Sequence, residues 1–158
     1  MSNRFRRLRF RGFSLIELLI VISIILIILA IALPKLNKST IYAKEMAAKA
    51  TISRTLHAAQ AQYMSQYGRY ATSLQELGPP SSGAPSQAAA DLIPTDLSKG
   101  EKGGFKYTIT GTPTGYAVNA EPMSFGSTGS HTYFSDQSLV VHEHNGQEPA
   151  TANDPEIK

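Results

Sequence analysis

The chain has 158 residues, enough for one small domain, and it has no cysteine, so a disulfide-stapled scaffold is excluded. It carries 15 basic and 12 acidic residues, a formal net charge of +3 at pH 7. Five of the basic residues are arginines within the first eleven positions, and residues 13–158 hold ten basic and twelve acidic residues, a net charge of −2. The excess of basic residues is therefore confined to the N-terminus, and it is poor evidence for a nucleic-acid site.

A long apolar run follows the arginines. Residues 13–33 contain one charged residue, Glu17, and two hydroxyl residues, Ser14 and Ser23. As a helix the run is about 30 Å long, which matches the hydrocarbon core of a bilayer. Because arginines are retained on the cytoplasmic side, we expect a single-pass protein with a cytoplasmic N-terminus and a periplasmic C-terminal domain.

Glu17 is an unusual residue in such a run. An acid at the bilayer centre costs about 2.5–3.5 kcal/mol, and less near the helix start, where the helix dipole also favours it. A cut after Gly12 would give Phe13 an α-amino group, and two opposite charges 4 Å apart gain about 4 kcal/mol at an effective dielectric of 20. Phe13 and Glu17 of one chain lie about 6 Å apart along the axis, so we expect the amine of a neighbouring chain to be the partner.

The residues Gly12-Phe13-Ser14-Leu15-Ile16-Glu17 resemble the processing signature of the type IV pilin family, which includes the pseudopilins of type II secretion. Pro34, which lies 21 residues after Phe13, matches the helix proline of that family. The resemblance covers residues 4–67 and is only architectural beyond them. It implies that a prepilin peptidase cleaves between Gly12 and Phe13 and methylates the new amine of Phe13. It also implies assembly with itself and with minor pilins, driven by an inner-membrane platform and an ATPase.

These patterns divide the N-terminal part into three segments. Residues 1–12 are expected to be a cleaved leader, residues 13–34 a transmembrane and polymerisation helix, and residues 35–67 an amphipathic helix. An apolar stripe at spacings of three and four predicts the last segment: it consists of Ile52, Leu56, Ala59, Tyr63 and Tyr67. We expect one helix over residues 13–67, bent or loosened at Pro34 and ended at Gly68.

The C-terminal part is expected to form a loop and a small sheet. Residues 68–104 resemble the family's αβ-loop, with a short capped helix over 72–77 and a helical turn over 87–92 that ends before Pro94. Residues 105–144 alternate like an antiparallel sheet of about four strands, with a tight turn at Asp136-Gln137, and residues 145–158 are a polar tail. The predicted fold is α+β: a long N-terminal helix packed on a small antiparallel sheet, as in pilins.

No constellation of catalytic residues is visible. His142 and His144 share one face of a predicted strand and are a candidate metal pair, but no further ligand follows from spacing. No nucleophile elbow and no phosphate-binding glycine loop occur in the sequence. We therefore expect no enzyme, no metal and no cofactor.

The leading hypothesis is a structural subunit of a type IV pilus-like filament, first in the inner membrane and then at the cell surface. A pseudopilin in a periplasmic pseudopilus and a monomeric membrane-anchored binding domain are the alternatives. A secretory signal peptide cut after Ala30-Ile31-Ala32 fits less well, because the apolar run is too long and Glu17 interrupts it. The tail has Asp154 and Glu156 but no compact acidic set for the calcium site expected of a major pseudopilin.

Overall fold

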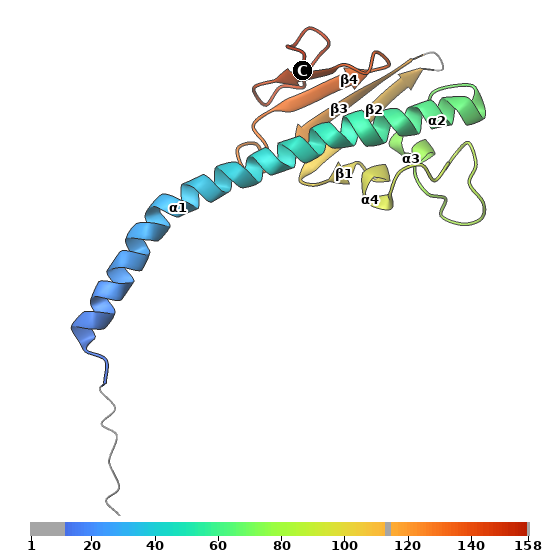
Figure 1. Cartoon of the computed structure of the whole chain (residues 1–158). Coiled ribbons are helices and arrows are strands. Elements are labelled where there is room, and N and C mark those ends of the chain that lie inside the picture. Colours follow the sequence, from blue (N-terminus) through green and yellow to red (C-terminus); the bar gives the residue numbers. More distant parts are fainter. Residues whose placement is uncertain (1–11, 113–114, 158) are drawn as a thin grey trace, which may run out of the picture. The chain divides into compact units, whose positions relative to one another are not determined.

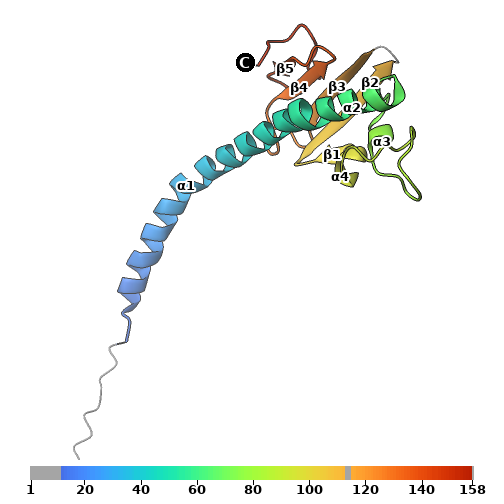
Figure 2. The ribbon, with the colours of Figure 1, turned by 45° about the vertical axis from the view of Figure 1, so that its right-hand side comes forward.

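The computed structural model describes residues 12–112 and 115–157, so most of the expected leader lies outside the described residues. The chain divides into two compact units, Met1–Leu36 and Asn37–Lys158. Helix α1 (Leu15–Ala50) begins in the first unit and ends in the second. Figure 1 labels the helices and strands β1 to β4, and Figure 2 also labels β5.

In the first unit the chain enters α1 directly after Ser14, whose carbonyl accepts a hydrogen bond from the backbone N–H of Leu18 at 3.1 Å. The helix continues past Pro34, since a proline removes one backbone hydrogen bond and leaves the others in place. The predicted N-terminal helix is thus confirmed from Leu15 onward. The predicted bend at Pro34 stays a prediction.

In the second unit α1 is followed by a π-helical turn, η1 (Thr51–Leu56), and by helix α2 (His57–Tyr67). The π turn was not predicted. The hydroxyls of Thr51 and Ser53 each donate to a carbonyl four residues earlier at 2.9 Å, and such side-chain bonds compete with the backbone ladder. Helix α2 ends at Gly68 as predicted, because this residue adopts the left-handed φ of 71° that closes a helix.

The sheet is antiparallel in the order β1-β2-β3-β4-β5. Its strands are β1 (Glu101–Lys102), β2 (Phe105–Thr112), β3 (Gly115–Pro122), β4 (Thr132–Asp136) and β5 (Val141–His144). We expected about four strands, and the additional one is β1. It has only two residues, and the turn that returns it to β2 is made by Gly103 and Gly104 at φ values of 63° and 85°, so no alternating pattern marked it.

The connection between α2 and the sheet contains the capped helix that the sequence predicted, α3 (Leu74–Leu77). The Ser73 hydroxyl accepts a hydrogen bond from the backbone N–H of Glu76 at 3.4 Å, as an N-cap does.

The helical turn predicted over residues 87–92 is wrong. The backbone there bonds to the chain around α3 instead, and the N–H of Leu92 donates to the carbonyl of Leu77 at 2.8 Å. The next helix, α4 (Thr95–Ser98), begins just after Pro94, because a proline suits the start of a helix better than its continuation.

The connection between β4 and β5 is also longer than predicted. We expected a tight turn at Asp136-Gln137, but β5 begins only at Val141. The carboxylate of Asp136 accepts a hydrogen bond from the backbone N–H of Ser138 at 2.8 Å, and this local bond keeps Ser138 out of the strand ladder.

Residues 145–157 fold back along β5. The N–H of Glu143 donates to the carbonyl of Pro155 at 2.9 Å, and the N–H of Ile157 donates to the carbonyl of Val141 at 2.8 Å. The tail therefore covers the edge strand and is held by backbone hydrogen bonds, in a chain that has no cysteine.

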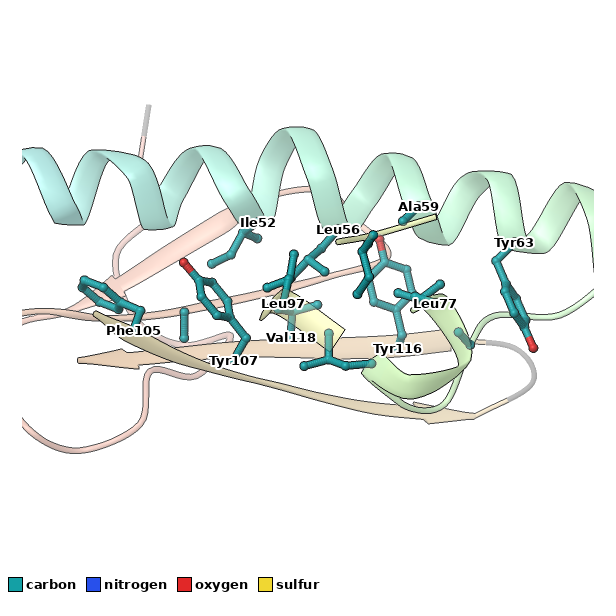
Figure 3. Close-up of a cluster of buried hydrophobic side chains, with 14 of the residues drawn as sticks. Ile52, Leu56, Ala59, Tyr63, Leu77, Leu97, Phe105, Tyr107, Tyr116 and Val118 are labelled. Atoms are coloured by element: carbon teal, nitrogen blue, oxygen red, sulfur yellow. The ribbon is translucent and has the colours of Figure 1, made fainter. Parts of the chain in front are cut away.

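Helix α2 lies across one face of the sheet (Figures 1 and 2), and the predicted apolar stripe is buried in the core on that face. Figure 3 shows its side chains against those of β2 and β3. The buried members of the stripe are Ile52, Leu56, Ala59 and Tyr63, and the buried residues of the strands include Phe105, Tyr107, Tyr116 and Val118. Tyr67 is partly buried, and Leu77 and Leu97 add α3 and α4 to the same core. Helix and sheet thus bury their apolar faces on each other.

Candidate functional site

The apolar side chains of residues 13–33 are uncovered in the single chain. The continuous helix Leu15–Tyr67 contains a stretch long and apolar enough to cross a membrane, and none of that stretch is buried. Phe13 is 76% exposed and Ile20 55% exposed, whereas the buried core of the second unit begins at Ala48. That core is therefore complete without residues 13–33, whose surface needs lipid or other chains to cover it.

Glu17 lies in the first turn of α1 and is exposed. Within residues 12–112 and 115–157 its carboxylate has no hydrogen bond or ion pair with another side chain. The N-terminal end of the helix dipole favours a negative charge there, but in apolar surroundings the carboxylate needs a cationic partner. The amine of Phe13 exists only after cleavage, so the predicted pair between chains stays a prediction.

A polar cluster joins α1 to the sheet. The Glu45 carboxylate is only 7% exposed, and its Oε1 accepts from the backbone N–H of Ser130 at 2.7 Å and from the Ser130 hydroxyl at 3.0 Å. Nδ1 of His131 lies 2.9 Å from the same oxygen. One turn further along α1, Nζ of Lys49 lies 2.6 Å from Oε2 of Glu143, on β5. Burial alone would raise the pKa of Glu45, but the hydrogen bonds from Ser130 and His131 outweigh it and lower that pKa.

A second set of polar side chains, linked by hydrogen bonds, is buried between the helix and strands β3 and β4. The Tyr116 hydroxyl lies 2.7 Å from Nδ1 of His57, and Nε2 of His57 lies 2.9 Å from the Ser135 hydroxyl. Ser135 donates to the carbonyl of Val140 at 2.6 Å, so its oxygen accepts from Nε2–H of His57. In the neutral form of His57, Nδ1 then accepts from the Tyr116 hydroxyl. Burial lowers the pKa of His57. Ser135 is fully buried, so its hydroxyl cannot meet a substrate.

His142 and His144, the candidate metal pair, both bind the tail. Nδ1 of His142 lies 2.7 Å from the backbone carbonyl of Asp154, and Nδ1 of His144 lies 2.8 Å from its carboxylate. The other carboxylate oxygen accepts from the N–H and hydroxyl of Thr151. The bond from His144 and those from Thr151 lower the pKa of Asp154 to about 2. No group of three or more metal-ligating side chains occurs among the described residues.

The sequence-predicted site residues thus fall in one place. Gly12, Phe13, Glu17 and Pro34 all belong to the first unit, at or within the exposed apolar helix. Sequence reasoning missed Glu45, although a signal was present: Glu45 lies seven residues before Ile52 and extends the apolar stripe by two turns. An acid on a buried stripe indicates a partner on the opposite layer.

Comparison with known proteins points to the same segment. Residues 7–33 match the family model described as the prokaryotic N-terminal methylation motif. The chain is similar to the type IV major pilin protein PilA of Myxococcus xanthus (strain DK1622), with 41% identity over 70 residues, which are 44% of this chain and 31% of that relative. The chain therefore spans about a third of the length of the curated relative it matches.

Proposed function

We propose that the chain is a member of the type IV pilin family and a structural subunit of a type IV pilus-like filament. In this proposal a prepilin peptidase cleaves between Gly12 and Phe13 and methylates the new amine, and the chain then polymerises through residues 13–34. The observation that carries the proposal is the apolar helix of residues 13–33, none of whose membrane-length stretch is buried, attached to a unit whose core closes without it.

Assembly would exchange lipid for neighbouring helices around residues 13–33. Because lipid tails and apolar side chains are similar in polarity, this exchange by itself gives little net driving force. A charge pair between Glu17 of one chain and the Phe13 amine of another supplies direction and register, since it forms only at one axial offset. An inner-membrane assembly platform and its ATPase would supply the work, with minor pilins as further partners.

Before assembly the subunit would be a single-pass inner-membrane protein with its second unit in the periplasm. The arginines of the leader support this orientation, because they favour a cytoplasmic N-terminus. After assembly the same unit would lie on the surface of the filament.

The test of this proposal is the variant Glu17→Val. It removes a polar group from the apolar helix, so membrane insertion and leader cleavage should proceed as in the wild type. It also leaves the Phe13 amine of another subunit buried without a partner, so the yield of filaments should fall strongly.

Ser23→Val is the matched control. Ser23 lies in the same helix, and its hydroxyl is already bonded to the carbonyl of Leu19 at 2.7 Å, so its loss removes a polar group but no charge. Filaments at wild-type yield from Glu17→Val would exclude the charge pair as the assembly contact, whereas equal losses in both variants would indicate a general packing defect instead.

A further inference from the structure

The connection between β3 and β4, residues 123–131, presents apolar side chains to the outside of the second unit. Met123 is 55% exposed and Phe125 is 40% exposed. Neither side chain is part of the hydrophobic core. An exposed phenylalanine and methionine so close together form an apolar surface that a protein domain usually covers with a partner.

Hydrogen bonds within the connection hold its backbone in place, so the exposure of Met123 and Phe125 is a property of the folded loop. The backbone N–H of Thr128 donates to the carbonyl of Ser124 at 2.8 Å, and that of Gly126 donates to the carbonyl of Gly129 at 2.8 Å. Gly129 lies against the ring of Phe105 so closely that an added Cβ would come within 2.5 Å of it. The loop is therefore fixed to the core at one end while Phe125 faces outward.

The same loop lies beside the first turns of helix in the second unit. A cavity of about 300 Å³ between the two is lined by Asn37 and Lys44 of the helix and by Ser127 of the loop, among others. Residues 37–44 and 123–130 together contain two basic residues, Lys38 and Lys44, and no acidic residue. The surface thus combines exposed apolar side chains with positive charge and hydroxyl groups.

Chain connectivity places this surface close to the expected membrane boundary. Asn37 is four residues beyond the last residue of the apolar run, Leu33, which is about 6 Å of helix rise. The headgroup layer on each side of a bilayer is about 5–8 Å thick. Asn37 itself therefore lies within or at the edge of that layer whenever residues 13–33 span the hydrocarbon core.

We propose that Met123 and Phe125 insert into the membrane interface while the subunit is anchored, with Lys38 facing anionic lipid headgroups. Apolar side chains flanked by lysines are the combination that binds at the headgroup boundary. The proposal rests on the membrane-anchored stage of the proposed function. The loop would hold the second unit against the bilayer until the helix is extracted, and it would then be released to the filament surface.

Lipid fits this surface better than a second copy of the chain. The second copy has a net charge of −2 spread over its mature chain, whereas an anionic headgroup layer presents a dense negative surface at the same depth as Lys38.

The chain has no tryptophan, so a single introduced tryptophan can report on the loop. Phe125→Trp is the loop reporter, and Leu139→Trp is the matched control reporter. Leu139 is 60% exposed and lies beyond the other end of β4. Each full-length variant is reconstituted in vesicles of phosphatidylcholine and phosphatidylglycerol, with and without lipids brominated near the headgroup end of their acyl chains.

We expect brominated lipid to quench the fluorescence of the loop reporter and to shift its emission to shorter wavelength, with no effect on the control reporter. Substituting Lys38→Gln in the loop-reporter chain, or omitting phosphatidylglycerol, should weaken that quenching.

Three results would count against the proposal in different ways. Equal emission of the two reporters in floated vesicles overturns the loop contact but leaves the membrane anchor intact. A second outcome is a loop reporter whose emission shifts to shorter wavelength without quenching by brominated lipid, to an extent that grows with the density of protein in the vesicles. This outcome identifies a second copy of the chain as the partner and also overturns the lipid contact. A full-length chain that does not float with vesicles contradicts the anchored stage itself.

Discussion

Oε1 of Glu45, in α1, lies 2.9 Å from Nδ1 of His131, 86 residues later in the chain. This contact, with the two hydrogen bonds from Ser130, fixes the helix to the start of β4. The second polar contact, in which His57 joins Tyr116 and Ser135, lies further along the helix. Two polar contacts therefore set the position of the helix along the sheet, whereas apolar packing alone tolerates sliding.

Replacing Glu45 by glutamine should lower the free energy of unfolding by about 1–3 kcal/mol, because a charged acceptor with three donors is lost. Glu148→Gln is the control, since this side chain is exposed, and its effect should stay within about 0.5 kcal/mol. Urea denaturation of residues 35–158 measures both. The folded-state pKa of Glu45 is lowered, so its stabilisation is present above pH 4.5 and is lost as the pH falls below that value. Equal effects of the two substitutions would contradict the role of this cluster.

The stability of the second unit should fall as the pH is lowered from about 6.5. Burial lowers the pKa of His57, so below 6.5, its ordinary value, the unfolded chain binds a proton that the folded chain does not. Above that pH both states are neutral and the contribution vanishes. In His57→Gln the dependence of stability on pH below 6.5 should be weaker, whereas Ser135→Ala should be less stable at every pH and keep the dependence. Urea denaturation midpoints at several pH values measure both variants. If the midpoint of His57→Gln depends on pH as steeply as that of the wild type, His57 is not the source of the pH dependence.

Residues 35–158 should form a soluble, folded monomer without metal or nucleotide, because the apolar helix that needs lipid or other chains is removed. Reductant should not change its melting temperature, since the chain has no cysteine. Leu56→Asp should unfold it, because Leu56 is fully buried between helix and sheet, whereas Leu139→Asp should be tolerated at an exposed turn. Circular dichroism and sedimentation test this, and a fragment that folds only when calcium is added would favour a major pseudopilin instead.

The long helix and its buried stripe were predictable from the sequence because both depend on local periodicity and on one glycine, Gly68. The backbone course of residues 87–92, before α4, was not predictable in the same way. Residues 87–92 have helix-forming side chains, but tertiary backbone bonds to α3 outcompete a single isolated turn. The strand start at Val141 depends on one side chain, Asp136, which captures the backbone N–H of Ser138.

The functional residues likewise fall into those that the sequence reveals and those that only the fold brings together. The signature from Gly12 to Glu17 is contiguous, so it could be found without a structure. The Glu45 cluster and the His57 contacts join residues far apart in the sequence, and only the fold brings those partners together. The exposed Phe125 likewise looked like any loop residue until the hydrogen bonds around it showed that its loop is fixed.

Mass spectrometry of shear-released surface fibres, identified by electron microscopy, tests the central claim most directly. The account predicts fibres that contain this chain, beginning at Phe13 and carrying a methyl group on its α-amine. Gly12→Leu should give an unprocessed membrane protein and no such fibres, because the scissile bond is then obstructed. Fibres built from a chain that keeps its leader, or that begins at Leu33 after Ala32, would contradict the account.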